Sequence, residues 1–238
     1  MIENSLPSVI TIDGPGGSGK GTISQHLAWK FGWEFLDSGA LYRLVGLSAT
    51  HKSIELGDVE KIAALARSLD AQFAVREGKC GTESIIFLED VDVTDTLRTE
   101  ECASAASRVA QFLPVREALL ERQRAFRVEP GLIADGRDMG TVIFPDAELK
   151  VFLTADAEIR AERRLKQLKG KGIDANLAAI LADIKARDKR DTNRSISPLI
   201  PADDATIIDT SDLSVQEVEE QVLRLAMSTF NLIEVENS

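Results

Sequence analysis

The chain has 238 residues, of which 44% are hydrophobic and 28% are charged, so it can bury a full core and is not expected to be disordered. Its net charge of -11 repels polyanions and argues against binding to a nucleic acid polymer or an anionic membrane. An anionic substrate would therefore need a local cluster of arginine and lysine side chains.

The N-terminal segment lacks the basic and apolar pattern of a secretion signal, and no apolar run approaches the ~18 residues of a membrane span. The two cysteines, Cys80 and Cys102, indicate buried thiols in a reducing compartment, and a disulfide or metal site is the less favoured alternative. We therefore expect a cytoplasmic protein, and we expect it to be a monomer.

Short β-rich apolar runs alternate along the chain with longer segments whose apolar residues recur every three or four positions. This alternation predicts an α/β fold in which helices cover a parallel sheet. We expect strands at residues 8–12, 34–36, 132–134, 150–153 and 206–208, and helices at 20–31, 41–50, 59–69, 114–127, 157–168 and 177–191. Pro114 suits a first helical position, and Ser214 with Glu217 forms a capping box that opens a last helix.

Two segments depart from this alternation. Residues 72–75 and 84–88, around the turn at 77–81, predict a hairpin and hence an inserted subdomain. Residues 169–173 lie between two charged helices and predict the tip of a lid. We expect a single domain with a core at 8–69, 111–158 and 174–230, an insert at about 70–110 and a lid at about 159–173.

A glycine-rich segment, Gly14-Pro15-Gly16-Gly17-Ser18-Gly19-Lys20-Gly21-Thr22, joins the first strand to an amphipathic helix. Its glycines let successive backbone N–H groups turn toward phosphate oxygens, and the helix N-terminus adds partial positive charge. Lys20 would reach the β- and γ-phosphates of ATP, and the Thr22 hydroxyl would lie near the phosphates or the metal. The alternative is a purely structural turn. We assign ATP binding to Gly14, Gly16, Gly17, Ser18, Gly19, Lys20, Gly21 and Thr22.

The residue after Lys20 is Gly21, where P-loop proteins usually carry a serine or threonine that binds the metal. Direct metal ligation at this position is therefore in doubt. The G-K-G-T sequence resembles nucleoside monophosphate kinases more than GTPase switch proteins.

Polar side chains follow the second strand. Ser38, Tyr42 and Arg43 open a helix at the carboxyl edge of the sheet, where open α/β folds bind their ligands. The alternative is a capped helix with an exposed Arg43. This position favours binding of the acceptor substrate.

The third strand ends in Asp135-Gly136-Arg137-Asp138. A carboxylate at the end of a strand is well placed to hold the Mg²⁺ of ATP, directly or through water. Charges crowded in this way are costly unless a ligand, a metal or each other satisfies them, so the pattern favours function.

Two later helices carry clustered arginines. Arg187, Asp191 and Arg194 share one face at i, i+4 and i+7 if the helix runs through them. A similar cluster occurs in the preceding helix, at Arg160, Arg163 and Arg164. The alternative is a solvated helix surface, but clustered arginines are expected where charge builds up on a transferring phosphoryl group.

These motifs together resemble the bacterial cytidylate kinases, in order, from about residue 9 to residue 227. The resemblance rests on residues 14–22, 37–43 and 134–142, and on Arg187-Asp188-Lys189-Arg190-Asp191 with Arg194. It implies a five-stranded parallel core of the P-loop NTPase type, an acceptor-binding insert and a short lid. It also implies that ATP with Mg²⁺ phosphorylates CMP and dCMP.

The resemblance further implies roles by position. Ser107 and Arg116, with Asp138, would read the cytosine, and Asp191 would hold the sugar hydroxyl. The arginines expected to clamp the acceptor phosphate are Arg43, Arg137, Arg187 and Arg194. Ser38, Tyr42 and Asp135 complete the substrate site, and the catalytic set is Lys20, Arg137, Arg187, Arg160 and Arg163. No metal ligand is assigned firmly, although Thr22 and Asp135 could act, in part through water.

Two other functions compete with this interpretation. A kinase of the same fold acting on a hydroxyl substrate such as shikimate would use Asp135 or Asp138 as a base. A regulatory NTPase would hydrolyse ATP slowly without a small acceptor. A phosphate acceptor needs no base, because its second pKa near ~6 leaves it largely ionised at neutral pH.

Overall fold

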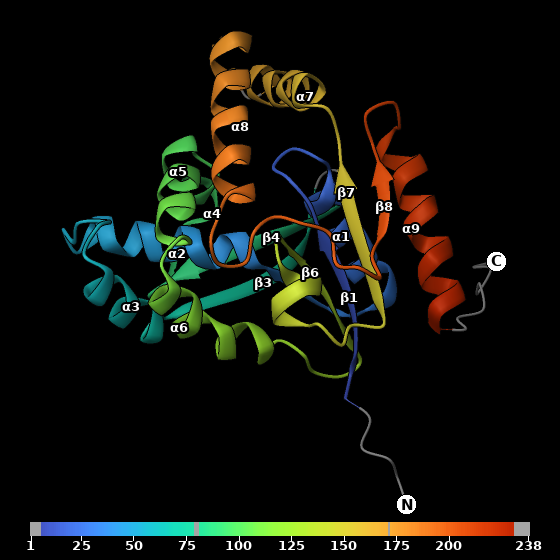
Figure 1. The fold of residues 1–238 in the computed structure, drawn as a ribbon, viewed down its shortest axis with the longest axis horizontal. Coiled ribbons are helices and arrows are strands. Elements are labelled where there is room, and N and C mark those ends of the chain that lie inside the picture. The colour runs from blue at the N-terminus through green and yellow to red at the C-terminus, as the bar shows by residue number, and fades with distance from the viewer. Residues whose placement is uncertain (1–5, 79–80, 171, 231–238) are drawn as a thin grey trace, which may run out of the picture.

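The computed structural model describes residues 6–78, 81–170 and 172–230. Its centre is a five-stranded parallel sheet with the strand order β2-β6-β1-β7-β8 (Figure 1). The strands are β1 Ser8–Asp13, β2 Glu34–Asp37, β6 Gly131–Gly136, β7 Leu149–Thr154 and β8 Thr206–Asp209. All five predicted strands are therefore confirmed in chain order, as is the α/β fold with a five-stranded parallel core.

Helices cover both faces of this sheet and its carboxyl edge (Figure 1). They are α1 Lys20–Phe31, α2 Ser38–His51, α3 Val59–Arg67, α6 Leu113–Arg124, α7 Ala157–Gly170, α8 Leu177–Thr192 and α9 Val215–Phe230. The predicted helices are confirmed, with ends displaced by up to three residues. Pro114 is the second helical residue of α6, not the first. The capping box is confirmed, because Ser214 N donates to Glu217 Oε2 at 2.8 Å and Glu217 N donates to Ser214 Oγ at 3.2 Å.

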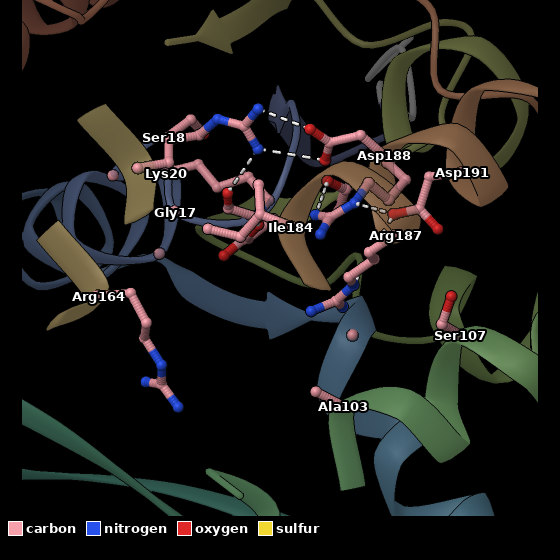
Figure 2. A pocket seen from close by; sticks show the side chains of 18 of the residues that line it. Gly17, Ser18, Lys20, Ala103, Ser107, Arg164, Ile184, Arg187, Asp188 and Asp191 are labelled. Carbon is pink, nitrogen blue, oxygen red and sulfur yellow. Dashed lines mark hydrogen bonds and ion pairs between the residues drawn. The ribbon is translucent and has the colours of Figure 1, made fainter. Parts of the chain in front are cut away.

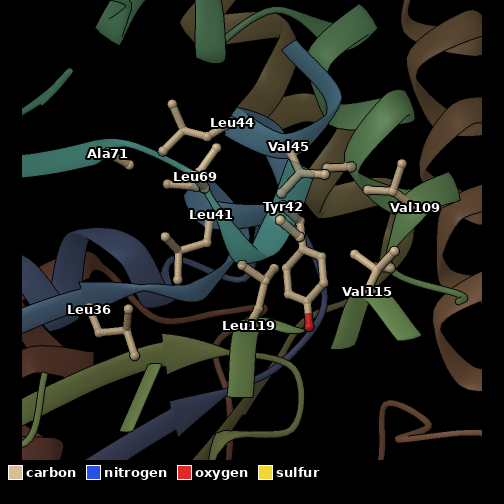
Figure 3. Packing of buried hydrophobic residues seen from close by; sticks show 14 of the residues in the cluster. Leu36, Leu41, Tyr42, Leu44, Val45, Leu69, Ala71, Val109, Val115 and Leu119 are labelled. Carbon is tan, nitrogen blue, oxygen red and sulfur yellow. The ribbon is translucent and has the colours of Figure 1, made fainter. Parts of the chain in front are cut away.

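The three inner strands, β6, β1 and β7, are buried on both faces, whereas the edge strand β8 is exposed except at Ile208. On β1, Ile10 and Ile12 face the core cluster of α1 and α9, whereas Val9 belongs to the opposite cluster. Figure 3 shows this second cluster, in which Leu36 of β2 lies near Leu41 of α2 and Leu119 of α6. Burial on two sides explains why the inner strands read as near-continuous apolar runs.

The segment between α3 and α6 builds a second, antiparallel sheet from β3 Ala71–Gly78, β4 Gly81–Leu88 and β5 Val91–Asp92. The predicted hairpin is confirmed, although Lys79 and Cys80 of its turn lie outside the described residues. Two helices that the sequence did not predict follow, α4 Thr94–Leu97 and α5 Glu100–Val109. The division into core, insert and lid stays a prediction.

The order of the strands creates the binding edge. From β1 the chain crosses to β2 and β6 on one side, and then returns to β7 and β8 on the other. Ligands of open α/β sheets bind at such a switch point, beyond the carboxyl ends of the strands. In Figure 1, α7 and α8 lie over this edge.

Within the described ranges, no helix combines the length and apolarity that crossing a bilayer requires.

The expected tip of the lid spans the end of α7. Lys169 and Gly170 are the last residues of this helix, so part of the predicted tip is helical. Lys171 and residues 231–238, where we expected the tail to fray, lie outside the described residues.

Candidate active site

A cleft of about 1170 Å³ opens at the carboxyl edge of the sheet. This volume exceeds the ~300–1000 Å³ of a typical small-ligand site. All the site residues predicted from the sequence line it except Gly14. Twelve arginine and lysine side chains line the cleft against seven carboxylates, in a chain whose net charge is -11. The cleft thus reverses the overall charge locally, as binding of anionic substrates requires.

The glycine-rich loop follows β1 and ends at the first turn of α1. Gly17 and Gly19 have positive φ values of 83° and 93°, which favour glycine. Gly14 lies beneath the loop, where a Cβ atom would approach the backbone oxygen of Leu153 to 2.0 Å. Ser18 Oγ donates to the Pro15 carbonyl at 3.1 Å and helps to close the loop. The predicted phosphate-binding loop therefore presents backbone groups at the N-terminus of α1.

Lys20 and Asp135 face each other at the floor of the cleft, with Nζ 3.7 Å from Oδ1. Burial and the nearby Arg137 lower the pKa of Lys20, whereas burial raises the pKa of Asp135 despite the attraction of Lys20. A Cβ atom on Gly21 would lie 3.2 Å from Asp135 Oδ2. A serine or threonine at position 21 would therefore crowd this carboxylate, which gives a physical reason for the glycine.

Asp135 and Thr22 are the candidate magnesium ligands, and both line the cleft beside Lys20. Within the described parts of the chain, no three His, Cys, Asp or Glu side chains form a group that could hold a metal ion. One carboxylate nevertheless fits Mg²⁺, which proteins commonly bind through one or two carboxylates together with substrate phosphates and water.

Asp191 of α8 is the centre of an arginine cluster. Its carboxylate accepts from Arg137 Nε at 3.1 Å and from Arg194 Nη2, and Arg187 Nε lies 4.0 Å away. Burial opposes the ionised form, yet the three guanidinium groups hold the pKa of Asp191 below its usual value. The helix does not run through Arg194, because α8 ends at Thr192, but Arg194 still reaches Asp191 from the residues that follow the helix.

Two of these arginines also reach the phosphate loop. A Cβ atom on Gly16 would lie 3.5 Å from Arg137 Nη2 and 3.7 Å from Arg187 Nη1. Figure 2 shows Lys20, Arg187 and Asp191 around the same space, and Arg43 of α2 lines it as well. The cationic groups predicted from separate motifs thus converge beside one loop.

The cleft also holds a buried ion pair between Arg116 of α6 and Asp138. The Arg116 guanidinium also lies over the Tyr42 ring, 5.6 Å from its centroid. On α5, Ser107 Oγ is buried and accepts from Arg190 Nε at 3.3 Å. The fold therefore brings Ser107, Arg116 and Asp138 to one cleft from three separate segments.

The α7 arginines make contacts within the protein. Arg160 donates four hydrogen bonds, to the carbonyls of Ala155 and Gly16 and twice to Asp188 of α8. Arg163 donates to the Thr210 hydroxyl at 3.0 Å and also to its carbonyl. Both side chains therefore tie α7 to the elements around the phosphate loop, and their catalytic roles stay predictions.

The cytidylate kinase family model matches residues 10–228 of the chain. The chain belongs to the cytidylate kinase family. It is 56% identical over 223 residues to the cytidylate kinase of Shewanella sp. strain MR-4, covering 94% of each chain. It is 55% identical to that of Shewanella oneidensis over the same length and the same shares. The cytidylate kinase from Shewanella frigidimarina is 56% identical over 226 residues, which cover 94% of this chain and 96% of that protein.

In this member of the cytidylate kinase family, several cleft contacts were not predicted from the sequence. Gln123 accepts from Ser38 Oγ at 2.6 Å, and the Thr210 hydroxyl donates to the Ser18 carbonyl at 3.1 Å. On α8, Asp188 accepts from Arg160 and Arg190 donates to Ser107. Asp188 and Arg190 lie inside a motif already noted, so their charge was a usable signal. Gln123 and Thr210 offer no local signal.

Proposed function

We propose that this cytidylate kinase family member transfers the γ-phosphoryl group of ATP to the phosphate of CMP or dCMP, forming CDP or dCDP. The observation that carries the proposal is the convergence of Arg137 and Arg187 beside Gly16 of the phosphate loop. Guanidinium groups beside a phosphate loop can stabilise the charge on a phosphoryl group in transit between two phosphates.

The acceptor would lie along the wall formed by α2, α5, α6 and α8. Asp138 and Ser107 can accept hydrogen bonds from the cytosine amino group, whereas uracil presents a carbonyl oxygen at that position. Asp191 already accepts from two arginines, and a carboxylate has about four lone-pair sites, so it can also accept from a sugar hydroxyl. Arg43, Arg137, Arg187 and Arg194 would hold the acceptor phosphate.

The chemistry needs positioning and charge neutralisation more than proton transfer. A phosphate monoester has a second pKa near ~6, so its attacking oxygen is already largely anionic at neutral pH. Lys20 and the arginines would hold the two phosphates in line. When Mg²⁺ is bound, it supplies further neutralisation at the β- and γ-phosphates, and Asp135 and Thr22 would hold it directly or through water.

A hydroxyl acceptor such as shikimate is the competing substrate, and it would need a carboxylate base. The two candidate bases are both engaged, because Asp135 faces Lys20 and Asp138 is paired with Arg116. Neither carboxylate can accept the proton of an acceptor hydroxyl without giving up part of its contact with that cation. This arrangement supports the phosphate acceptor.

The remaining features of the proposal concern the whole molecule. Residues 70–110 would serve as the acceptor-binding insert, and residues 159–173 as the lid. Lid closure would bring Arg160 and Arg163 over ATP and exclude water from the transfer. We further propose that one chain suffices for activity and that the protein works in the cytoplasm.

A coupled assay of ADP release with CMP, dCMP, UMP and shikimate as acceptors tests the proposal. CMP and dCMP should be phosphorylated, with UMP at least about tenfold less efficient in kcat/KM. Turnover of shikimate equal to or better than that of CMP would reject the proposed acceptor. Slow ATP hydrolysis that CMP does not change would instead indicate a regulatory NTPase.

A further inference from the structure

Asp13 is the last residue of β1, directly before Gly14 of the phosphate loop. Its side chain is buried and accepts two hydrogen bonds from consecutive backbone amides. Met139 N donates to Oδ1 at 2.9 Å, and Gly140 N donates to Oδ2 at 2.8 Å. These amides open the short π-helix η1 Met139–Ile143, where N–H groups have no partner within the helix. A single carboxylate thus joins β1 to the start of η1.

This arrangement is costly for the fold. No cation forms an ion pair with Asp13 in the part of the chain that the structure describes. Burial raises the pKa of its carboxyl to about 7, even though the two amide hydrogen bonds lower it. A buried carboxylate without a counterion contributes poorly to stability, so a role in the active site better explains its presence.

The residues just before the Met139 and Gly140 amides, which Asp13 holds, belong to the acceptor site. Asp138 is the N-cap of η1, and its carbonyl accepts from Val142 N at 2.9 Å and from Ile143 N at 3.2 Å. Its side chain forms the buried ion pair with Arg116 on the acceptor wall. Fixing the first amides of η1 therefore fixes the backbone that carries Asp138, and Arg137 immediately before it.

The start of η1 also packs directly against β1. A Cβ atom on Gly140 would lie 2.9 Å from Thr11 Oγ1 and 3.2 Å from Lys150 Cδ. Thr11 is two residues before Asp13, on the same face of β1. β1 therefore contacts η1 through hydrogen bonds at Asp13 and through direct packing at Thr11.

We propose that Asp13 is a positioning residue, which sets the Asp138 carboxylate and the Arg137 guanidinium relative to the phosphate loop and thereby controls acceptor selectivity. This inference rests on the proposed function. Asp13 itself does not line the cleft. It links the backbone of the ATP loop to the backbone that reads the acceptor, so its loss affects the acceptor side first.

Asp13→Asn tests this role, because an amide keeps only one accepting oxygen and leaves one of the two N–H groups without a partner. The KM for CMP should rise at least about tenfold and the KM for ATP less than about threefold, and the CMP-over-UMP ratio of kcat/KM should fall at least about fivefold. Asp146→Asn makes the same change in an exposed ion pair with Arg127 and should leave these values unchanged. Equal changes in both KM values, or unchanged selectivity, would overturn the inference.

Amide hydrogen exchange measures the clamp itself without any substrate. In Asp13→Asn, exchange at Met139 and Gly140 should accelerate at least about tenfold, whereas the amides of β6 should keep their wild-type rates. Unchanged rates at the two amides would overturn the clamp. A wild-type protein that does not phosphorylate CMP would instead reject the proposed function, and the selectivity role with it.

A second pair of variants decides the matter if Asp13→Asn does not fold. Gly140→Ala should produce the same KM split, because its Cβ atom pushes the turn away from Thr11. Thr11 Oγ1 has no hydrogen-bond partner among the described residues, so Thr11→Ala removes the nearer obstacle without breaking a hydrogen bond, and the other, Lys150 Cδ, belongs to a flexible side chain. The double variant should therefore recover most of the affinity for CMP. The inference would be overturned if Gly140→Ala changed the KM for CMP no more than the KM for ATP, or if the double variant did not recover affinity for CMP.

Discussion

The buried pair of Asp138 and Arg116 allows a quantitative test of base recognition. Asp138→Asn keeps the size of the side chain but removes its charge and adds a donor. A mismatched hydrogen bond at a base edge costs ~1–3 kcal/mol, which corresponds to about 5–150-fold in selectivity. The new NH₂ group can face the uracil carbonyl, so UMP should gain while CMP loses. We expect the CMP-over-UMP ratio of kcat/KM to fall at least about tenfold.

The assay is ADP release with CMP and UMP varied separately at saturating ATP. Asp146→Asn is the matched control, since Asp146 also pairs with an arginine but at an exposed site. Asp138→Asn also leaves the buried Arg116 with a neutral partner, which should lower the free energy of unfolding by ~1–3 kcal/mol. A loss of stability with a CMP-over-UMP ratio within twofold of wild type would show that Asp138 only holds Arg116, and would refute its assignment to the base.

Three further outcomes follow from the geometry. Arg137→Ala should lower kcat at least about tenfold, and a nearly normal rate would remove Arg137 from the site. Gly14→Ala should destabilise the protein by ~3 kcal/mol or more, because its Cβ atom would meet the Leu153 carbonyl at 2.0 Å, whereas Gly57→Ala has nothing within 4 Å and should keep the wild-type denaturant midpoint. The pKa of Asp13 rises from 3.8 to about 7 on folding, so ionisation opposes the folded state. The free energy of unfolding of wild type should therefore fall relative to that of Asp13→Asn from about pH 4 to 7, and urea titrations that show a rise would contradict this.

Structural features that depend on only a few neighbouring residues could be predicted from the sequence. The phosphate loop and its flanking strand and helix are one example, because glycine spacing and apolar periodicity are local signals. The inner strands β6, β1 and β7 were predictable because burial on both faces makes each a near-continuous apolar run. The order of these strands across the sheet was not predictable from these runs, since each pairing joins residues far apart in the chain.

Helix α5 was missed because its inward face is built from small residues. Its buried positions include Cys102, Ala103 and Ala106, which give a weak apolar pattern. The reason for small residues lies on the neighbouring helix, where a Cβ atom on Gly46 of α2 would lie 2.9 Å from the Cβ of Ala105. The two helices approach closely, and a sequence pattern based on large apolar residues does not detect such contacts.

The site residues that escaped prediction are mostly partners of residues that were predicted. Asp188 neutralises Arg160 across 28 positions of the chain, and Thr210 receives Arg163 across 47. A buried arginine needs an acceptor, but the sequence does not say which element supplies it. Asp188 is one turn of α8 away from Asp191, so the same helix supplies counterions to both arginine groups. A buried cation in a motif therefore predicts an acceptor on some element packed against it, and for Arg160 that element, α8, was already marked by its alternating charges.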